Sequence, residues 1–317
     1  MKRWFGLDQA EQIGPITAIG VYDGVHRGHR LLIRRGLSDA RRSGHPMVVV
    51  TFSPNPAEVV RERPPTRLAT LEHRLLLIES LGVDATLVLD FDQHMSQLSP
   101  AQFVNDVLVD GLGAACVVVG ENFRFGYRAS GDVESLRQFG APSGMTVDAV
   151  SLLREELVGR PDVPISSTEI RRLVAQGEIS AATRALARPH RVEGQVVLGD
   201  QRGRGLGYPT ANVATTTLAA VPGDGVYAGQ LVVAPYTADA RTWPAAVSVG
   251  SNPTFGGEER RVEAFVLDAP TEFDLYDAHV AVDFVAKVRD QLTFRGEAEL
   301  IVRMATDVIE VRRLLGL

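Results

Sequence analysis

The feature that most constrains the fold is a change of pattern near residue 188. Before it, short and almost continuous apolar runs alternate with amphipathic helical patterns; the runs cover residues 16–20, 47–52, 85–89, 115–120 and 146–150. Strands that are apolar on both faces and separated by helices are typical of a parallel sheet with helices on both sides. We therefore expect an α/β fold whose N-terminal part is a doubly wound parallel sheet.

Beyond residue 188, strand-like runs follow one another without intervening helices. They cover residues 191–198, 225–233, 245–249, 262–267 and 279–288, and helical alternation returns only at residues 297–315. Consecutive strands joined by turns favour an antiparallel sheet or barrel. We expect two domains, residues 1–187 and residues 188–317, the second an antiparallel β-barrel with a terminal helix.

Composition narrows the class of protein. A chain of 317 residues with 45% hydrophobic and 23% charged residues is typical of a globular protein with two cores. Its formal charge of −6 argues against a general nucleic-acid or membrane partner. The single cysteine, Cys116, excludes an intrachain disulfide and lies in an apolar run, as a buried small residue would. With no secretory core or spanning run in the pattern, we expect a cytoplasmic enzyme; its oligomeric state stays open, self-association included.

The motif with the clearest chemistry is Gly-Val-Tyr-Asp-Gly-Val-His-Arg-Gly-His at residues 20–29, between the first strand and a helical pattern that starts at Arg30. Backbone N–H groups and the positive end of the dipole make a helix start an anion site. His26 and His29 can both donate hydrogen bonds to phosphate oxygens, and Gly28 leaves room between them. The alternative is an ordinary turn with a surface histidine pair. No Gly-x-x-x-x-Gly-Lys-Ser/Thr motif occurs.

Two further motif-rich loops follow strands of the predicted sheet. Ser-Pro-Asn-Pro follows residues 47–52. Gly-Glu-Asn-Phe-Arg-Phe-Gly begins at the last residue of the run 115–120 and extends to residue 126. Ligands of open α/β sheets bind at the carboxyl ends of the strands, where these loops would meet. The aromatic side chains at this edge are either a ligand pocket or ordinary core.

The run at residues 20–29 resembles the signature of nucleotidyltransferases with a His-x-Gly-His motif, and within them the bacterial bifunctional riboflavin kinase/FAD synthetases, which usually have Phe where Tyr22 stands. The resemblance implies that His26 and His29 are catalytic in the transfer of AMP to FMN. It implies ATP contacts at Gly20, Tyr22, Asp23, Gly24, Gly28, Asn122, Ser167, Thr168 and Arg171, and a flavin site at Phe52, Asn55, Phe123 and Phe125. Asn55 stands where many members have His, so we assign it no catalytic role.

The Ile-Ser-Ser-Thr-x-Ile-Arg segment that contains Ser167 has two compatible interpretations. Ser166 and Glu169 have the spacing of a capping box at the start of a helix. Hydroxyl groups and an arginine at a helix start also suit a triphosphate, and the segment resembles the second signature of these nucleotidyltransferases.

The second half has its own glycine-rich loop, residues 199–207, which alone predicts a phosphate loop or a flexible hairpin tip equally well. Together with the Tyr-Pro-Thr-Ala-Asn segment that follows it, this loop resembles the signature of riboflavin kinases. That resemblance implies ATP contacts at Gly199, Gly203, Arg204, Gly205, Leu206, Gly207, Pro209, Thr210 and Asn212. Thr210 offers a hydroxyl ligand to Mg²⁺, and Asn212 would complete or orient that shell.

Glu263 is an isolated acid in the apolar run 262–267, a pattern that by itself predicts an outward-facing residue. The resemblance makes it the general base for the ribityl 5′-hydroxyl of riboflavin. The chain departs from the family at Ala264, where many members have His, and at Asp277, where many have Gly; the effect of both departures is open.

Together the motifs imply an enzyme that phosphorylates riboflavin to FMN in its C-terminal domain and adenylylates FMN to FAD in its N-terminal domain. ATP, riboflavin and FMN would be its small-molecule substrates, FAD its product and Mg²⁺ its cofactor. One alternative is a flavin- or nucleotide-sensing protein that has lost one activity. Another is a different nucleotidyltransferase, such as one acting on phosphopantetheine, which would leave the second domain unexplained.

Overall fold

The computed structural model of the chain describes residues 1–197, 210–251, 260–269, 275–294 and 296–317. It divides into two compact units: Met1–Pro65 with Thr70–Ser166, and Thr66–Ala69 with Ser167–Leu317. The predicted domain boundary between residues 187 and 188 stays a prediction. Within the described ranges, no helix is both long and apolar enough to span a bilayer.

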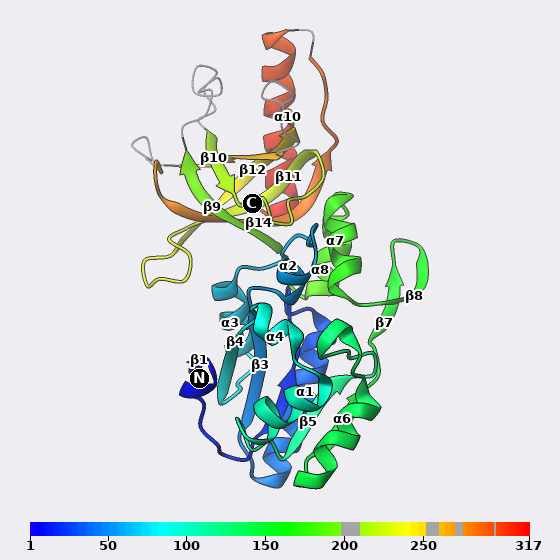
Figure 1. Ribbon diagram of the computed structural model, residues 1–317. Helices are drawn as coiled ribbons and strands as arrows, with labels where there is room; N and C mark the ends of the chain where they lie inside the picture. Colours follow the sequence, from blue (N-terminus) through cyan, green and yellow to red (C-terminus); the bar gives the residue numbers. More distant parts are fainter. Residues whose placement is uncertain (198–209, 252–259, 270–274, 295) are drawn as a thin grey trace. The chain divides into compact units, whose positions relative to one another are not determined.

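The first unit is built on a six-stranded parallel sheet with the strand order β1-β4-β3-β2-β5-β6 (Figure 1). Its strands are β1 (Lys2–Phe5), β2 (Ile16–Ile19), β3 (Met47–Ser53), β4 (Ala85–Asp90), β5 (Cys116–Gly120) and β6 (Thr146–Val150). From β2 the chain runs to β3 on one side and later to β5 on the other. The carboxyl end of β2 is therefore the switch point at which ligands of such sheets bind.

Both faces of this sheet are covered, as the apolar runs predict. Side chains alternate along β3: Met47 and Val49 pack in one core, and Val48 and Val50 in the other. The first core includes residues of α1 (Arg27–Ser43) and α3 (Leu71–Glu79). The second includes residues of α5 (Pro100–Phe103), the π-helical turn η2 (Val104–Val109) and α6 (Val133–Gly140). The smaller elements are η1 (Leu7–Gln9), α2 (Pro56–Val60), α4 (Gln93–Gln97), η3 (Tyr127–Ala129), η4 (Ala141–Ser143) and the hairpin of β7 (Arg154–Leu157) and β8 (Arg160–Pro164).

The second unit is a closed antiparallel barrel with the strand order β10-β13-β12-β11-β14-β9. Its strands are β9 (His190–Val197), β10 (Thr210–Thr215), β11 (Gly225–Val233), β12 (Arg241–Ser251), β13 (Arg260–Val266) and β14 (His279–Arg289), followed by α10 (Glu297–Leu315). Two helices, α7 (Ser167–Ala175) and α8 (Ile179–Leu186), precede the barrel. Ile179 of α8 is buried within the barrel's main hydrophobic core.

The structure confirms the fold class and differs from the sequence interpretation in detail. Helix α1 begins at Arg27 instead of Arg30, because His26 caps it. Strands β1, β7, β8 and β10 were not expected, and β12 begins at Arg241, before the predicted run at residues 245–249. β10 shows why: Thr210–Thr215 has little apolar character of its own and becomes a strand by pairing with β9 and β13.

Candidate active sites

The first candidate site lies at the start of α1, directly after β2. His26 is the N-cap of this helix, and its Nδ1 accepts a hydrogen bond from the backbone N–H of His29 at 3.3 Å. An imidazole nitrogen that accepts a hydrogen bond carries no proton, so a neutral His26 carries its proton on Nε2. The cap therefore fixes a tautomer whose Nε2–H is a donor, in a side chain that is 4% exposed.

The two imidazoles lie against each other. The ring centroids of His26 and His29 are 3.5 Å apart with an angle of 21° between the planes, and His29 meets Tyr22 edge-on at 5.1 Å. A Cβ atom on Gly28 would come within 3.2 Å of the His26 ring and of the carbonyl oxygen of Ile165. A side chain at this position would require its neighbours to shift by a few tenths of an ångström, which agrees with the space predicted for glycine here.

The turn between β2 and α1 has unusual backbone angles. Tyr22, Gly24 and Val25 have φ values of 54°, 81° and 39°. Left-handed angles cost energy in residues other than glycine, most of all in a β-branched one, and persist only where the surroundings hold them. Tyr22 and Asp23 are buried, and burial raises the pKa of the Tyr22 hydroxyl, which has no hydrogen-bond partner among the described residues. A phenylalanine, which is usual at this position in the resembled family, has no hydroxyl group that would need a partner.

A cavity of about 570 Å³ lies beside this turn and is lined by Gly20 and Val21. Its walls are rich in aromatic side chains: Phe52, Phe91, Phe103, Phe123 and Phe125. The rings of Phe123 and Phe125 stack with centroids 5.5 Å apart, and those of Phe52 and Phe91 meet edge-on at 5.7 Å. The cavity is apolar and suited to a flat ring system. It brings together the three predicted flavin-site phenylalanines and adds Phe91, Phe103 and Met95, which no motif marks.

Several predicted residues of this site do not line the cavity, among them Asn55, Asn122, Ser167 and Thr168. Asn55 is the N-cap of α2, and its side chain accepts a hydrogen bond from the N–H of Ala57 at 3.0 Å. Asn122 is exposed in the loop after β5. Ser167 and Thr168 begin α7, in the second compact unit. The role of Asn55 in flavin binding and the roles of Asn122, Ser167 and Thr168 in ATP binding stay predictions.

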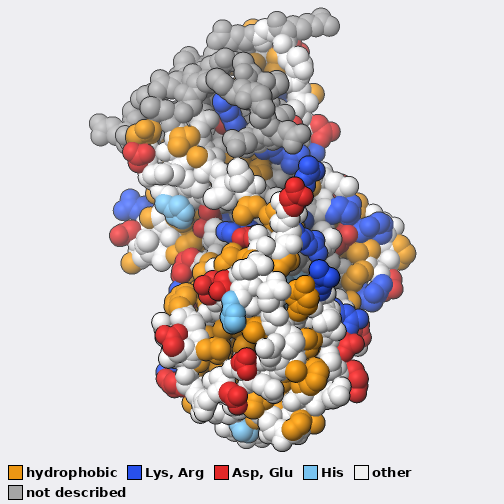
Figure 2. Space-filling model, in the orientation of Figure 1, with side chains coloured by type: hydrophobic (Ala, Val, Ile, Leu, Met, Phe, Trp, Pro, Cys, Tyr) orange, Lys and Arg blue, Asp and Glu red, His pale blue; other side chains and the backbone are white. Residues whose placement is uncertain are grey.

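Arg171, the last residue of the predicted ATP set, also lies on α7 and donates from Nε to the carbonyl of Thr66 at 2.6 Å, within the second unit. On the first unit, Lys and Arg side chains gather over the hairpin β7–β8 (Figure 2). Arg27, in the first turn of α1, pairs with Glu155 of this hairpin at 2.6 Å. The hairpin is thereby tied to the helix that starts at the histidine motif.

The second candidate site lies on the outer face of the barrel. Glu263 of β13 is directly opposite Asn212 of β10 on one side and Ser248 of β12 on the other. Phe265, the next residue of β13 on the same face, is opposite Thr210 and Ala246. Residues opposite each other in neighbouring strands share a face, so Thr210, Asn212 and Glu263 point to the same side.

This outer face is covered by α10, which leaves a cavity of about 250 Å³. Thr210, Ser248, Glu263 and Phe265 line it from the strands; Leu300, Met304, Asp307 and Val308 line it from the helix. Val262 and Ala264, the neighbours of Glu263 in sequence, are buried inside the barrel. Glu263 therefore faces outward, as its pattern predicts, and it faces a cavity instead of open solvent.

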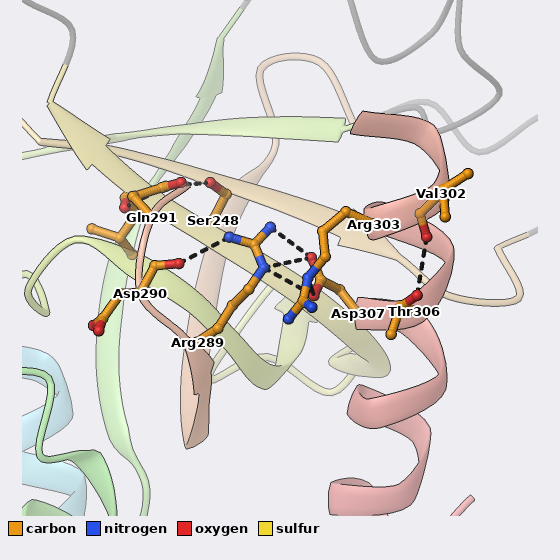
Figure 3. A network of polar contacts seen from close by, with 9 residues as sticks. Ser248, Arg289, Asp290, Gln291, Val302, Arg303, Thr306 and Asp307 are labelled. Atoms are coloured by element: carbon orange, nitrogen blue, oxygen red, sulfur yellow. Dashed lines mark hydrogen bonds and ion pairs between the residues drawn. The ribbon is translucent and has the colours of Figure 1, made fainter. Parts of the chain in front are cut away.

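A polar network anchors α10 to the barrel next to this cavity (Figure 3). Asp307, 5% exposed, is contacted by Arg289 of β14 at 2.7 Å and by Arg303 of the same helix at 3.0 Å. Arg289 also donates to the carbonyl of Asp290 at 2.9 Å, and Gln291 donates to the Ser248 hydroxyl at 3.1 Å. Burial of an ion pair with several hydrogen bonds fixes geometry more than it adds stability. No motif in the sequence marks these residues, and their local signal is the (i, i+4) spacing of Arg303 and Asp307.

Part of the predicted kinase site falls outside the described residues, namely Gly199, Gly203, Arg204, Gly205, Leu206, Gly207 and Pro209. Both departures from the family can be located. Ala264 is fully buried in the barrel core, and Asp277 has a φ of 60°. Because Asp tolerates the left-handed region better than most residues, it fits where other members have Gly.

Comparison with known proteins gives matches over almost the whole chain. The FAD synthetase family matches residues 8–169, and the riboflavin kinase family matches residues 186–315. The bifunctional riboflavin kinase/FMN adenylyltransferase of Escherichia coli (strain K12) is 33% identical over 312 residues, 98% of this chain and 96% of the relative. The protein of the same description from Pseudomonas fluorescens is 37% identical over 306 residues, 96% of this chain and 94% of the relative.

A solved structure from Streptococcus pneumoniae, described as a macrolide-efflux protein, has a TM-score of 0.85 and 27% identity, and covers 98% of this chain and 99% of its own. The two halves thus match two different families in the same order as in the full-length relatives. The chain belongs to the family of bifunctional riboflavin kinase/FMN adenylyltransferases.

Proposed function

We propose that the site around His26 transfers AMP from ATP to FMN, and that the site around Glu263 phosphorylates riboflavin with a second ATP. The observation that carries this proposal is that each compact unit has its own cavity beside the polar side chains that one of the reactions needs.

In adenylyl transfer, an oxygen of the FMN phosphate attacks the α-phosphorus of ATP, and pyrophosphate leaves. The Nε2–H of His26 and the backbone N–H groups at the start of α1 are donors for the negative charge that builds up on the phosphoryl oxygens. His29 supports His26 through ring stacking and through its own N–H. No covalent bond to the protein forms in this reaction.

The flavin ring of FMN would occupy the cavity next to Gly20, between the aromatic walls. Phe52, Phe123 and Phe125 offer flat apolar surface to the ring. Gly20, at the end of β2, brings this cavity close to the turn that leads to His26. This arrangement would place the FMN phosphate toward the helix start.

In the kinase reaction, the 5′-hydroxyl of riboflavin attacks the γ-phosphorus of ATP, ADP leaves, and Glu263 accepts the hydroxyl proton. A half-buried carboxylate that lines a cavity is positioned to act as a general base. Phe265 and Met304 in the same cavity would contact the flavin ring.

The residues present suit Mg²⁺ in the kinase site. Thr210 and Asn212 provide a hydroxyl and an amide oxygen on the same face as Glu263, and oxygen ligands are the ones that Mg²⁺ takes. When bound, the ion would neutralise charge on the ATP phosphates.

Product analysis tests this proposal. The protein is incubated with riboflavin, ATP and Mg²⁺, and we expect FMN to form first and FAD to follow. FMN alone, or FAD only from added FMN, would support the alternative of a flavin-binding protein that has lost one activity. No flavin product at all, with ATP still bound, would contradict both assignments.

A further inference from the structure

A buried arginine links the two walls of the first candidate site. Arg74 of α3 is 6% exposed. Its Nη1 donates to the carbonyl oxygen of Val21 at 2.8 Å, and its Nη2 donates to that of Phe52 at 2.7 Å. Val21 begins the turn that leads to His26, and Phe52 is in the aromatic wall; both line the same cavity. One guanidinium therefore contacts the backbone of both parts of the site.

The position of these carbonyls explains why a side chain is needed there. The ladder between β2 and β3 ends at the pair Ile19 and Val50. Beyond it the two chains separate, because one enters the turn while β3 continues alongside β4. The Val21 carbonyl also accepts from the Thr51 hydroxyl at 3.0 Å. Arg74 thus takes the place of the next rung of the ladder and carries two donors in a rigid plane.

The turn between β2 and α1 also contains strained backbone angles that its surroundings must stabilise. It holds Tyr22 and Val25 at positive φ, a strain that lasts only if neighbouring contacts hold it. Strand-end carbonyls also present partial negative charge at the edge where phosphates would bind. A guanidinium keeps its positive charge at all ordinary pH values, and buried there it favours anions at this edge.

We propose that Arg74 is a positioning residue for adenylyl transfer, because it holds the turn before His26 and the aromatic wall at Phe52 in a fixed relation. Arg74 acts through these two backbone segments and is not itself a catalytic residue. This inference rests on the proposed function of the site around His26.

The test compares two substitutions of Arg74 with a control on the same helix. Arg74→Met removes both donors and the charge; since misplacement by about 1 Å can cost a hundredfold, we expect turnover from FMN to FAD to fall by about that factor. The apparent KM for FMN should rise as well, because Phe52 is released. Arg74→Lys keeps the charge and one donor site, and its loss should lie between the two extremes.

Arg3→Gln is the matched control. Arg3 of β1 holds the same helix through Glu72 at 2.8 Å and Glu79 at 3.1 Å, and it contacts neither loop of the site through these pairs. Because partly exposed ion pairs contribute little, we expect FAD formation to change by less than about threefold. Urea unfolding followed by Trp4 fluorescence, with Trp243→Phe in the background, reports whether the first unit of each variant is folded.

Three results would overturn the inference: Arg74→Met with near wild-type turnover, a fall in turnover with an unchanged KM for FMN, or an equal loss in Arg3→Gln. The second result indicates a smaller folded fraction, which lowers turnover without changing the KM. His26→Ala in the same assay separates this inference from the proposed function. If His26→Ala is fully active, the site itself is assigned wrongly; if only Arg74→Met is active, the site stands and the positioning role fails.

Discussion

The two candidate sites are built in opposite ways. In the first unit, the turn, the cap and the histidine pair come from one stretch of ten residues, Gly20 to His29, between β2 and α1. In the second unit, the corresponding side chains come from three strands and a helix and meet only because the barrel closes in one register. Local sequence therefore specifies much of the first site, whereas the second depends on strand pairing and on the docking of α10.

The largest expected effect is the loss of riboflavin phosphorylation at the second site. Glu263→Gln keeps the shape of the side chain and removes the proton acceptor, so riboflavin phosphorylation should fall by about 10²–10⁴ in turnover. The apparent affinity for riboflavin should change little, because the lost interaction belongs to the transition state. Initial rates of FMN formation at saturating ATP measure this, and FAD formation from added FMN should be unaffected.

Thr210→Val is the contrast for this variant. It removes a proposed Mg²⁺ ligand, so extra Mg²⁺ should restore part of its activity and should restore none in Glu263→Gln. If Glu263→Gln keeps more than about a tenth of wild-type turnover, its role as a general base is wrong by the magnitude expected for one.

A somewhat smaller effect is expected at the first site. His26→Ala removes the proposed donor and the helix cap, and FAD formation from FMN should fall by about 10²–10³, the usual cost of losing such a donor. His26→Asn restores a good cap residue but not the reach of the imidazole. We expect its Tm to recover and its turnover to stay low. Recovery of both would mean that His26 acts only as a cap. Riboflavin phosphorylation should be unchanged in both variants.

The next prediction concerns acid stability of the second unit. His190 is fully buried with Nε2 at 2.6 Å from the Ala220 carbonyl, and burial lowers its pKa from 6.5 to about 4. Between these values the unfolded chain binds a proton that the folded chain does not, so folded stability is full above pH 6.5 and decreases as the pH falls toward 4. The loss should be on the order of 3 kcal/mol.

Urea unfolding measured by Trp243 fluorescence tests this prediction, with Trp4→Phe in the background so that only the second unit reports. His190→Gln keeps a donor for Ala220 but does not titrate, so its stability should lose this part of the pH dependence. An unchanged slope in His190→Gln would assign the acid sensitivity to other groups.

The smallest expected effect is a difference in stability between two fragments, which locates the start of the second unit more closely. Residues 188–317 should fold and convert riboflavin to FMN without forming FAD. A fragment of residues 167–317 keeps α7 and α8, including Ile179, which is 1% exposed in the barrel core. Burial of one such side chain is worth roughly 1.5–3 kcal/mol, so the longer fragment should be more stable by about that amount. Equal stability would favour the boundary at 187/188, and an inactive shorter fragment would show that the kinase needs α8.

The same contrast explains which elements of the fold could be predicted from the sequence. The parallel sheet was predictable because its strands are apolar on both faces. The caps of α3 at Thr70 and of α5 at Ser99, both present in the structure, were predictable in principle because their signals are local. The polar strand β10 and the hairpin β7–β8 were not, because their pairing partners define them.

The same limit applied to the sites. The histidine motif was recognisable, but the bridge made by Arg74 and the network around Asp307 require contacts between separate segments. Glu263 was ambiguous for a physical reason: alternation predicts which side of the strand it occupies, and only the position of α10 turns that side into a cavity.

The central claim is that each reaction has its own site, one dependent on His26 and the other on Glu263. Mixing the two defective proteins, His26→Ala and Glu263→Gln, tests it most directly. With riboflavin, ATP and Mg²⁺, the first alone should form FMN and almost no FAD, and the second alone should form neither. The mixture should form FAD, because FMN released by the first is a substrate for the second. FMN accumulation in the mixture without FAD would contradict the claim, since it would mean that adenylylation also requires Glu263.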